Sequence, residues 1–332
     1  MNEFNRNVVD RLLVEHTAFS RAISKLNQCF DSAIHSDKPI NLPIVGESRT
    51  GKSTVADEFY SNHLPYREPD GLKVPVLKVV APSEPSVIGL AEHMLFQIGD
   101  ERFSHGTKTQ KTARLKIMIT AAETKLVMID ECQHFVDKAT DRLIHSVADW
   151  LKTLVDESGV SLVILGLESV LAVLDQNEQL RGRFLAPVEM PRFDWRNQRD
   201  RNEFKGIVKA FNSRISEDFD CLDLSNSQMV FRLYVATGGL IGYLWKLLRQ
   251  ATLNAGYSGS SVIGLDELHD AYLDAIGERY GPSPFMADFD IKATKKNVEE
   301  AISKGKHVET KTESKRRSKR VKKESVDRML RV

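Results

Sequence analysis

A glycine-rich segment near the N-terminus combines residue types that bind phosphate. Residues 46–54 read Gly-Glu-Ser-Arg-Thr-Gly-Lys-Ser-Thr and match G-x-x-x-x-G-K-[ST] at every fixed position. The glycines permit backbone conformations in which successive N–H groups point toward phosphate oxygens, and the lysine adds a charge for the β- and γ-phosphates. The following serine hydroxyl is a candidate Mg²⁺ ligand. Nine residues are therefore predicted to surround a nucleotide: Gly46, Glu47, Ser48, Arg49, Thr50, Gly51, Lys52, Ser53 and Thr54.

An acidic pair follows an apolar run further along the chain. Leu126–Ile129 leads directly into Asp130 and Glu131, as expected of a buried strand that presents carboxylates at its C-terminal edge. Asp130 would hold Mg²⁺ directly or through water, and Glu131 would polarise the water that attacks the γ-phosphate. The sequence contains neither an Asn-Lys-x-Asp element for guanine nor an LSGGQ-like segment. ATP is therefore the predicted nucleotide, and its hydrolysis is the predicted reaction.

Alternating strand and helix patterns are predicted to position these residues. Apolar runs of the kind that suit a parallel sheet covered on both faces occur at Ile40–Val45, Pro75–Val80, Leu126–Ile129 and Ser161–Leu165, with 188–191 as a candidate fifth strand. Pro43 counts against a central strand at the first of these. Helical patterns separate the strands at Lys52–Tyr60, Val87–Ile98, Thr109–Glu123 and Thr140–Glu157. Residues 38–195 are therefore predicted to form a doubly wound α/β core.

The segments on either side of this core are predicted to be helical. Apolar residues recur at helical spacing over residues 5–36, and we expect an N-terminal helical segment at 1–37. A small helical domain is expected at 196–280, with helices at Arg199–Phe211, Ser225–Thr237, Leu240–Gly256 and Leu265–Ile276 and no convincing strand. Residues 281–332 form a polar, lysine-rich tail that is predicted to be flexible when it is unbound.

Charge and composition limit the class of protein. Residues 304–323 hold ten Lys or Arg and two Glu, a net charge of +8, so the remainder of this chain of net charge +1 carries −7. The basic tail could grip DNA, dock on a protein, or keep the chain in solution. Three widely spaced cysteines predict reduced thiols rather than disulfides or a zinc site. With neither a signal peptide nor a membrane-spanning run, we expect a cytoplasmic protein.

With these residues in hand, the chain resembles an AAA+ ATPase over residues 5–280, with a helical lid after the P-loop sheet. Leu180-Arg-Gly-Arg-Phe184 lies where AAA+ proteins carry an arginine finger. The resemblance implies that Arg183 is the finger, reaching the nucleotide bound by a neighbouring subunit, with Arg181 as its assistant or substitute. A guanidinium offers fixed donors where charge develops during phosphoryl transfer. The alternative is a solvated arginine pair that ends a helix.

The sensor positions depart from the broad AAA+ pattern. Gly242 stands about where a lid arginine is expected, and Lys246 or Arg249 would have to substitute for it. For the sensor that follows the run Ser161–Leu165, Glu168 and Ser169 are weak matches.

A narrower resemblance is to the TnsC/TniB transposition ATPases of Tn-seven-like elements, including those of CRISPR-associated transposons. It covers most of residues 10–255 and rests on GESRTGKST, IDECQHF (129–135), LGLESV (165–170), LRGRF and TGGLIGYLWKLL (237–248). It implies a bacterial ATP-dependent homo-oligomer, a ring or filament around double-stranded DNA, that links a target-selecting protein to transposase subunits. ATP would be the assembly switch, because each site needs an arginine from the next protomer.

Basic residues in one polar connection are candidate DNA contacts. Lys108, Lys111 and Arg114 accompany small hydroxyl residues within segment 104–114. Such residues suit phosphates and would bind the DNA backbone without sequence preference, although an ordinary solvated loop is an equal alternative. Phe285 and Phe289 could anchor a partner or pack on the lid.

Other functions remain open at the level of the sequence. The alternatives are a replication initiator or helicase loader of the same fold, a metabolic P-loop kinase, and a signalling ATPase with negligible turnover. An intact Glu131 counts against the last, and the basic tail is unneeded in a kinase.

Overall fold

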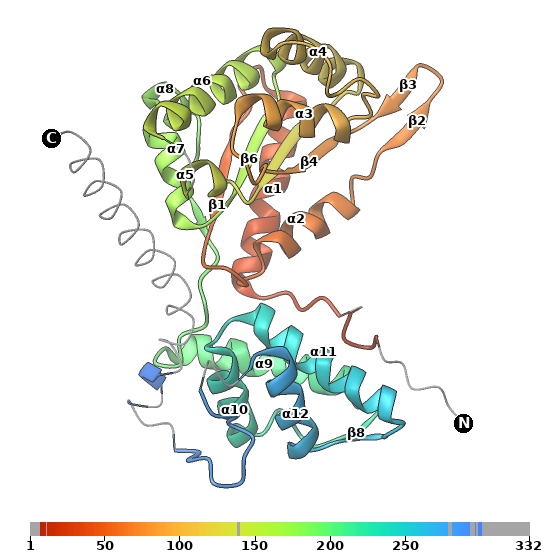
Figure 1. Cartoon of the computed structure of the whole chain (residues 1–332), viewed down its shortest axis with the longest axis vertical. Helices are drawn as coiled ribbons and strands as arrows, with labels where there is room; N and C mark the ends of the chain where they lie inside the picture. Colours follow the sequence, from red (N-terminus) through yellow and green to blue (C-terminus); the bar gives the residue numbers. More distant parts are fainter. Residues whose placement is uncertain are drawn as a thin grey trace, which may run out of the picture. The chain divides into compact units, whose positions relative to one another are not determined.

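The chain divides into two compact units. A computed structural model describes residues 7–10, 12–137, 140–277, 281–292, 296 and 298–300. One unit is Glu15–Pro191, and the other combines the described residues from Arg192 onward with the N-terminal segment that ends at Val14. Figure 1 labels most elements of both units. The domain limits expected from the sequence stay a prediction.

Five parallel strands form the sheet of the Glu15–Pro191 unit. Their spatial order is β4 (Val76–Val80), β5 (Leu126–Asp130), β6 (Ser161–Gly166), β1 (Leu42–Val45) and β7 (Val188–Glu189). β1 leads into the glycine segment and β5 ends in the acidic pair, with β6 between them. Because the strands are parallel, both motifs lie at the same edge of the sheet, where α/β proteins bind ligands.

Pro43 is accommodated although β1 lies inside the sheet. On the side of β1 that faces β7, Asn41 exchanges backbone hydrogen bonds with Arg183 and Leu185, and the Val45 carbonyl accepts one from Met190. Pro43 lies between these bonds, so its missing N–H interrupts a short stretch of pairing next to the edge strand.

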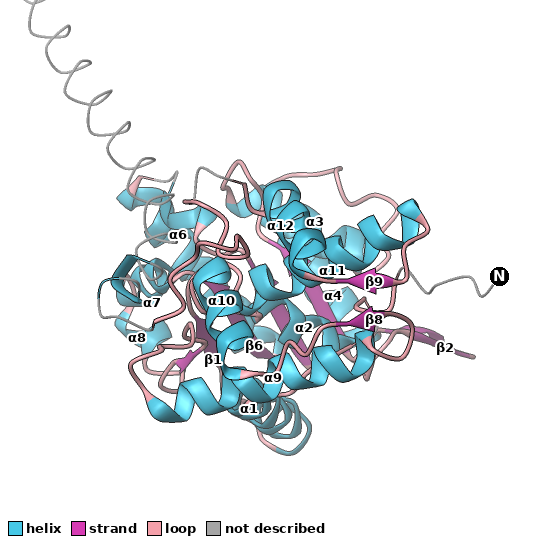
Figure 2. Ribbon diagram, turned by 90° about the horizontal axis from the view of Figure 1, so that it is seen from below, coloured by secondary structure: helices cyan, strands magenta, loops and turns pink. Residues whose placement is uncertain are grey.

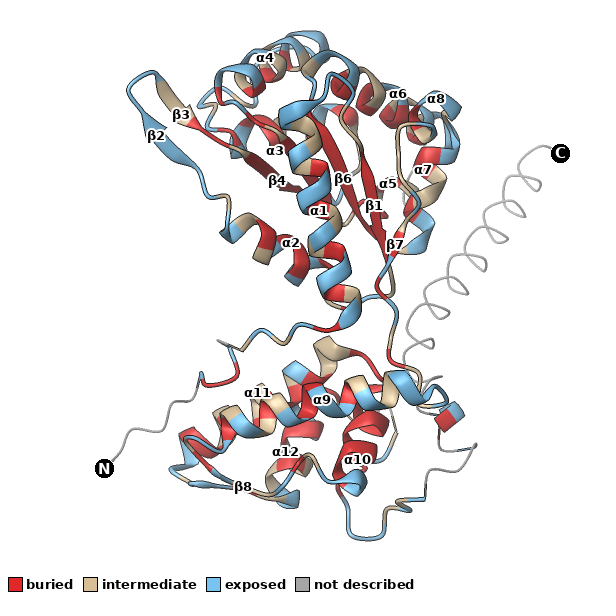
Figure 3. Cartoon of the chain, turned by 180° about the vertical axis from the view of Figure 1, so that it is seen from behind, coloured by how far each residue is buried: buried red, intermediate tan, exposed pale blue. Residues whose placement is uncertain are grey.

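Helices cover both faces of the sheet. α1 (Thr17–His35) and α2 (Lys52–Ser61) pack on one face, and α3 (Val87–Gln97), α4 (Lys108–Ala121) and α6 (Asp141–Ser158) pack on the other. Buried strands between the two helical layers appear in Figure 3. Successive residues of β5 alternate between the two cores, with Leu126 and Met128 in one and Val127 and Ile129 in the other. The predicted α/β fold with a doubly wound parallel sheet is confirmed.

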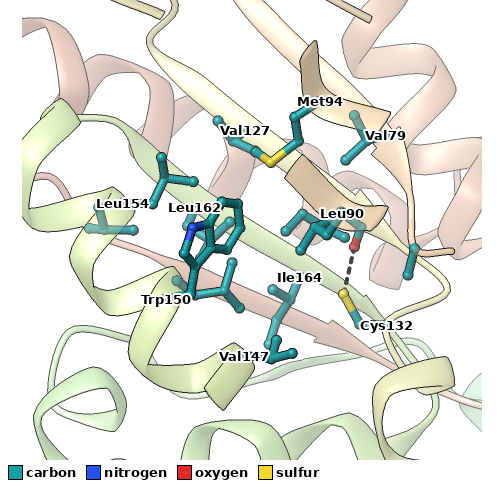
Figure 4. Packing of buried hydrophobic residues seen from close by; sticks show 14 of the residues in the cluster. Val79, Leu90, Met94, Val127, Cys132, Val147, Trp150, Leu154, Leu162 and Ile164 are labelled. Carbon is teal, nitrogen blue, oxygen red and sulfur yellow. Dashed lines mark hydrogen bonds between the residues drawn. The ribbon is translucent and has the colours of Figure 1, made fainter. Parts of the chain in front are cut away.

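The larger core is built from aliphatic and aromatic side chains of α3 and α6. Figure 4 shows Trp150 of α6 and Met94 of α3 against Val127 and Leu162 of the sheet. Leu162 is fully buried, and burying a side chain of this size contributes about 1.5–3 kcal/mol. This core therefore fixes β5 and β6, whose ends carry the site. Shorter elements complete the unit: β2 (Tyr66–Glu68), β3 (Gly71–Lys73), α5 (His134–Asp137), η1 (Glu168–Val170), α7 (Leu171–Asp175) and α8 (Glu178–Arg181).

The second unit is mainly helical. It contains α9 (Gln198–Ile215), α10 (Ser227–Thr237), α11 (Ile241–Ser258) and α12 (Leu265–Ala275), together with two short parallel strands, β8 (Asp220–Cys221) and β9 (Val262–Ile263) (Figure 2). Nine consecutive residues of α10, from Met229 to Thr237, are buried, so this helix is the centre of the unit. The four helices lie close to where the sequence predicts them.

Two local expectations, the helix over residues 5–36 and the absence of strands in 196–280, were wrong, and one hairpin was not predicted. The helix expected over residues 5–36 begins only at Thr17, because Val8 and Val9 enter the core of the helical unit instead. The β2–β3 hairpin has no signal in the sequence, because its first strand is fully exposed. The strands β8 and β9, where none was expected, have two residues each and thus show no periodicity.

Candidate nucleotide-binding site

The glycine segment forms a tight loop between β1 and α2. Arg49 and Gly51 both adopt positive φ, at 68° and 96°, and the second value favours a residue without a Cβ. Gly46 is needed for space, because an added Cβ would lie 2.3 Å from the Met190 carbonyl oxygen. Lys52 is 8% exposed, and its Nζ donates to the carbonyl oxygens of Gly46 at 2.8 Å and Glu47 at 2.7 Å. The loop backbone therefore surrounds the Lys52 ammonium group.

The acidic pair meets this loop at the start of α2. The Ser53 hydroxyl donates to Asp130 Oδ2 at 2.6 Å, and the other carboxylate oxygen accepts from the Glu131 N–H at 2.7 Å. Asp130 is 5% exposed, so its negative charge lies beside the hydroxyl in a sheltered position. A carboxylate and a hydroxyl in contact at the end of a phosphate-binding loop fit the donor set that Mg²⁺ takes with a nucleotide.

Glu131 leaves the strand in an unusual backbone conformation. Its φ of 57° is positive, which is uncommon for a residue with a side chain. The side chain accepts a hydrogen bond from the amide of Gln133. The structure thus brings Lys52, Ser53, Asp130 and Glu131 to one edge of the sheet, as the sequence predicts. Their catalytic roles stay a prediction.

Arg183 follows α8 and is held by an acidic residue of α6. Its Nε and Nη2 donate to the two carboxylate oxygens of Asp156 at 2.7 and 3.0 Å, and its side chain is 35% exposed. Asn41, which is fully buried, donates to the Arg183 carbonyl and accepts from the Leu162 N–H. Asn41 therefore links the backbone of Arg183 to β6. Sequence reasoning missed this role, since the two residues are 142 positions apart.

Arg181 has a weaker attachment. Its Nε lies 3.7 Å from Asp175 Oδ1. Its Nη1 is buried and has no hydrogen-bond partner among the described residues. Arg181 is the last residue of α8 and Arg183 follows it by two residues; a role of either arginine at a neighbouring subunit's site stays a prediction.

Lys246 and Arg249, the two candidate substitutes for a lid arginine, have partners within the helical unit. In the helical unit, Lys246 Nζ donates to the Ala275 carbonyl, and Arg249 Nε donates to Asp10 Oδ1 at 2.6 Å. Gly239 has a packing role, because an added Cβ would lie 2.2 Å from the Phe193 carbonyl oxygen. The glycine at position 239 of segment 237–242 thus allows Phe193 to pack closely against the helical unit.

Two of the three candidate DNA contacts are engaged inside the protein. Lys111 is 3% exposed, and its Nζ donates at 2.6 Å both to Glu92 and to the Ser104 carbonyl. Arg114 donates to Asp100 at 2.6 Å and to backbone carbonyls of the preceding loop. Both organise the connection between α3 and α4. Lys108, the first residue of α4, is exposed, and its role as a DNA contact stays a prediction.

The remaining candidates pack inside the helical unit or lie outside the described residues. Phe285 is 2% exposed and Phe289 lies 6.4 Å from Phe231 between ring centroids, so both pack on the helical unit. The basic run 304–323 lies outside the described residues. All three cysteines are free, and burial raises the pKa of each thiol. Among the described residues, no helix is long and apolar enough to cross a membrane.

Comparison with known proteins agrees with this fold. The model of the bacterial TniB protein family matches residues 6–195, more than half of the chain. A solved structure of the Aeropyrum pernix ORC1 protein in complex with DNA is similar with a TM-score of 0.58 at 16% identity, over 83% of this chain and 70% of that one. The CDC6P structure from Pyrobaculum aerophilum gives a TM-score of 0.57 at 10% identity, over 82% and 71%. No curated protein matches. The fold is that of an AAA+ P-loop ATPase, and the chain belongs to the bacterial TniB family.

Proposed function

We propose that this protein is an ATP-dependent regulator of DNA transposition that assembles on double-stranded DNA. In this role it links a target-selecting protein to the transposase. Membership in the TniB family supports the link to transposition. One observation carries the proposal of ATP hydrolysis: the loop with buried Lys52 meets the carboxylate of Asp130 through Ser53, and Glu131 follows directly.

The chemistry follows from these positions. Lys52 would turn from its two loop carbonyls to the β- and γ-phosphates, where its positive charge would interact with full negative charges. Ser53 and Asp130 would hold Mg²⁺, which supplies charge neutralisation at the phosphates. Glu131 would accept the proton of the attacking water. The N–H groups of the loop and the start of α2 would bind phosphate oxygens.

Assembly would be coupled to the nucleotide through Arg183. A guanidinium that contributes to a neighbouring protomer's site must be within reach of the surface, and Arg183 is 35% exposed on the connection after α8. ATP would then favour an oligomer, because its γ-phosphate gives the arginine a partner. Hydrolysis removes that partner and would release the assembly.

The test is size-resolved binding to duplex DNA with ATP, ADP or no nucleotide. Wild-type protein should form large DNA-bound assemblies with ATP alone. Arg183→Ala should abolish them while it still binds ATP, and Arg142→Ala is a matched control because Arg142 is an exposed arginine of the same unit. A wild-type protein that stays monomeric and ignores DNA in every condition would contradict the proposal and favour a kinase or signalling ATPase.

A further inference from the structure

A glutamine that the proposed chemistry does not use bridges two parts of the site. Gln133 lies two residues after Glu131, at the start of the turn into α5, and is 9% exposed. Its side-chain nitrogen donates to Glu131 Oε2, and its side-chain oxygen accepts from the Leu167 N–H at 3.2 Å. Both hydrogen-bonding functions of this amide therefore have partners, one at the acidic pair and one at the end of β6.

The orientation of the amide is determined by its surroundings. A backbone N–H can only donate, so the group that faces Leu167 must be the amide oxygen. The NH₂ group then faces Glu131, whose ionised carboxylate can only accept. A reversed amide would place a donor against a donor and an acceptor against an acceptor. Gln133 is thus a directed bridge between the carboxylate and the backbone of residue 167.

The end of β6 is shaped to receive this side chain. Gly166, its last residue, has no side chain, and an added Cβ would lie 2.6 Å from the Gln133 side-chain oxygen. The Gly166 carbonyl accepts from the N–H of Gly46 at 3.2 Å, which ties the same strand end to the phosphate loop. Gln133 therefore occupies space that a side chain at position 166 would need.

We propose that Gln133 is the positioning residue that orients the Glu131 carboxylate, and that Gly166 leaves the room that its side chain needs to do so. This inference rests on the proposed ATP hydrolysis with Glu131 as the base. A glutamate side chain has several rotatable bonds, and ordering it before the reaction removes an entropic cost from the barrier. Glu131 leaves β5 with a positive φ, and its backbone determines only the direction of the first side-chain bond. The side-chain amide of Gln133 holds the carboxylate at the other end of the side chain.

Steady-state ATP hydrolysis by the full chain on duplex DNA tests the proposal, with nucleotide affinity measured separately. Gln133→Ala should lower kcat on the order of tenfold to hundredfold, the scale of a misplaced catalytic group, with KM and ADP affinity within about twofold. Gln133→Met keeps the length of the side chain and adds no charge, but it loses both hydrogen bonds and should lose kcat as well. A side chain that only fills space would tolerate this apolar change of similar size, so this variant separates positioning from packing.

Gly166→Ala supplies a second route to the same change. The added methyl should displace the glutamine and lower kcat to the level of Gln133→Ala. The double variant should be no worse than Gln133→Ala alone, because the two substitutions remove one interaction. A kcat for Gln133→Ala that is unchanged or raised, or additive losses in the double variant, would overturn the positioning role. If the wild type binds no ATP or Glu131→Gln hydrolyses normally, the proposed hydrolysis fails instead.

Discussion

At the residue scale, the charged groups of the site have internal partners in this structure. Lys52 donates to loop carbonyls, Ser53 donates to Asp130, and Arg183 is paired with Asp156. Each of these contacts competes with one that nucleotide binding or assembly would require. The strength of each internal contact therefore sets how readily the site changes to its working arrangement.

The first prediction concerns Asp156, which holds Arg183, the proposed arginine finger, within its own protomer. Asp156→Asn should weaken the hold on Arg183 and lower the protein concentration needed for ATP-dependent assembly on DNA. The pair is partly exposed on both sides, and such pairs contribute about 0.2–1 kcal/mol, so we expect a shift of roughly fivefold or less. Glu157→Gln on the same helix is the control, since Glu157 pairs with Lys116 of α4 instead. If Asp156→Asn instead needed a higher protein concentration for half-maximal assembly, Asp156 would be a residue that orients Arg183 toward the neighbouring protomer.

A second prediction separates binding from hydrolysis. Glu131→Gln should keep Mg²⁺-dependent ATP binding but lower kcat by about 10²–10⁴-fold, the usual contribution of a general base. Asp130→Asn should instead weaken binding of the Mg²⁺–ATP complex, because a metal ligand is lost beside Ser53. Titration calorimetry with and without EDTA, together with phosphate release, distinguishes the two variants. Equal loss of binding in both would contradict the assigned roles.

At the scale of elements, the sequence predicts those features that are determined by local residue patterns, namely the buried strands and the motifs at their ends. Apolar runs such as Leu126–Ile129 identify buried strands because both faces of a parallel sheet are covered. The placement of the two motifs follows, because the carboxyl ends of the parallel strands β1 and β5 lie at the same edge of the sheet. Pairing between distant segments has no local signal, so the bridges from Gln133 to Leu167 and from Asn41 to Arg183 become visible only in the structure.

Helical periodicity has a related limit. It shows that a residue will be buried but does not show in which core. Val8 and Val9 fit a helical pattern together with the residues of α1, yet they lie in the core of the other unit. Likewise, Lys111 reads as a basic loop residue, whereas burial beside Glu92 makes it part of the internal structure.

The connection between α3 and α4 gives the third prediction. Lys111→Ala should lower the free energy of unfolding by about 1–3 kcal/mol, because it leaves the Ser104 carbonyl and Glu92 without their partner. Lys108→Ala should leave stability within about 0.5 kcal/mol, but weaken duplex DNA binding and reduce its salt dependence by about one phosphate contact. Urea unfolding and salt titrations of DNA affinity measure both. Unchanged DNA binding by Lys108→Ala would remove this helix start from the proposed DNA surface.

At the scale of the whole molecule, the chain connects its two units twice, after Val14 and after Pro191. The N-terminal segment is part of the helical unit although the rest of that unit follows the sheet. Val8 and Val9 are fully buried there, and Asp10 pairs with Arg249 of α11 at 2.6 Å. Loss of this segment should therefore affect the helical unit while the phosphate loop remains intact.

The fourth prediction uses that difference between the units. Combining Val8→Ala with Val9→Ala removes four buried methyl groups in total and should destabilise the helical unit by roughly 2–4 kcal/mol, from lost transfer energy and cavities. Hydrogen exchange should quicken in peptides of α10 and α11, while peptides of β5 and β6 keep their protection. Leu13→Ala is the control, because Leu13 is 38% exposed and lies in the same segment. Faster exchange in β5 and β6 as well would show that the units unfold together, and no change in α10 would show that the segment is not part of that core.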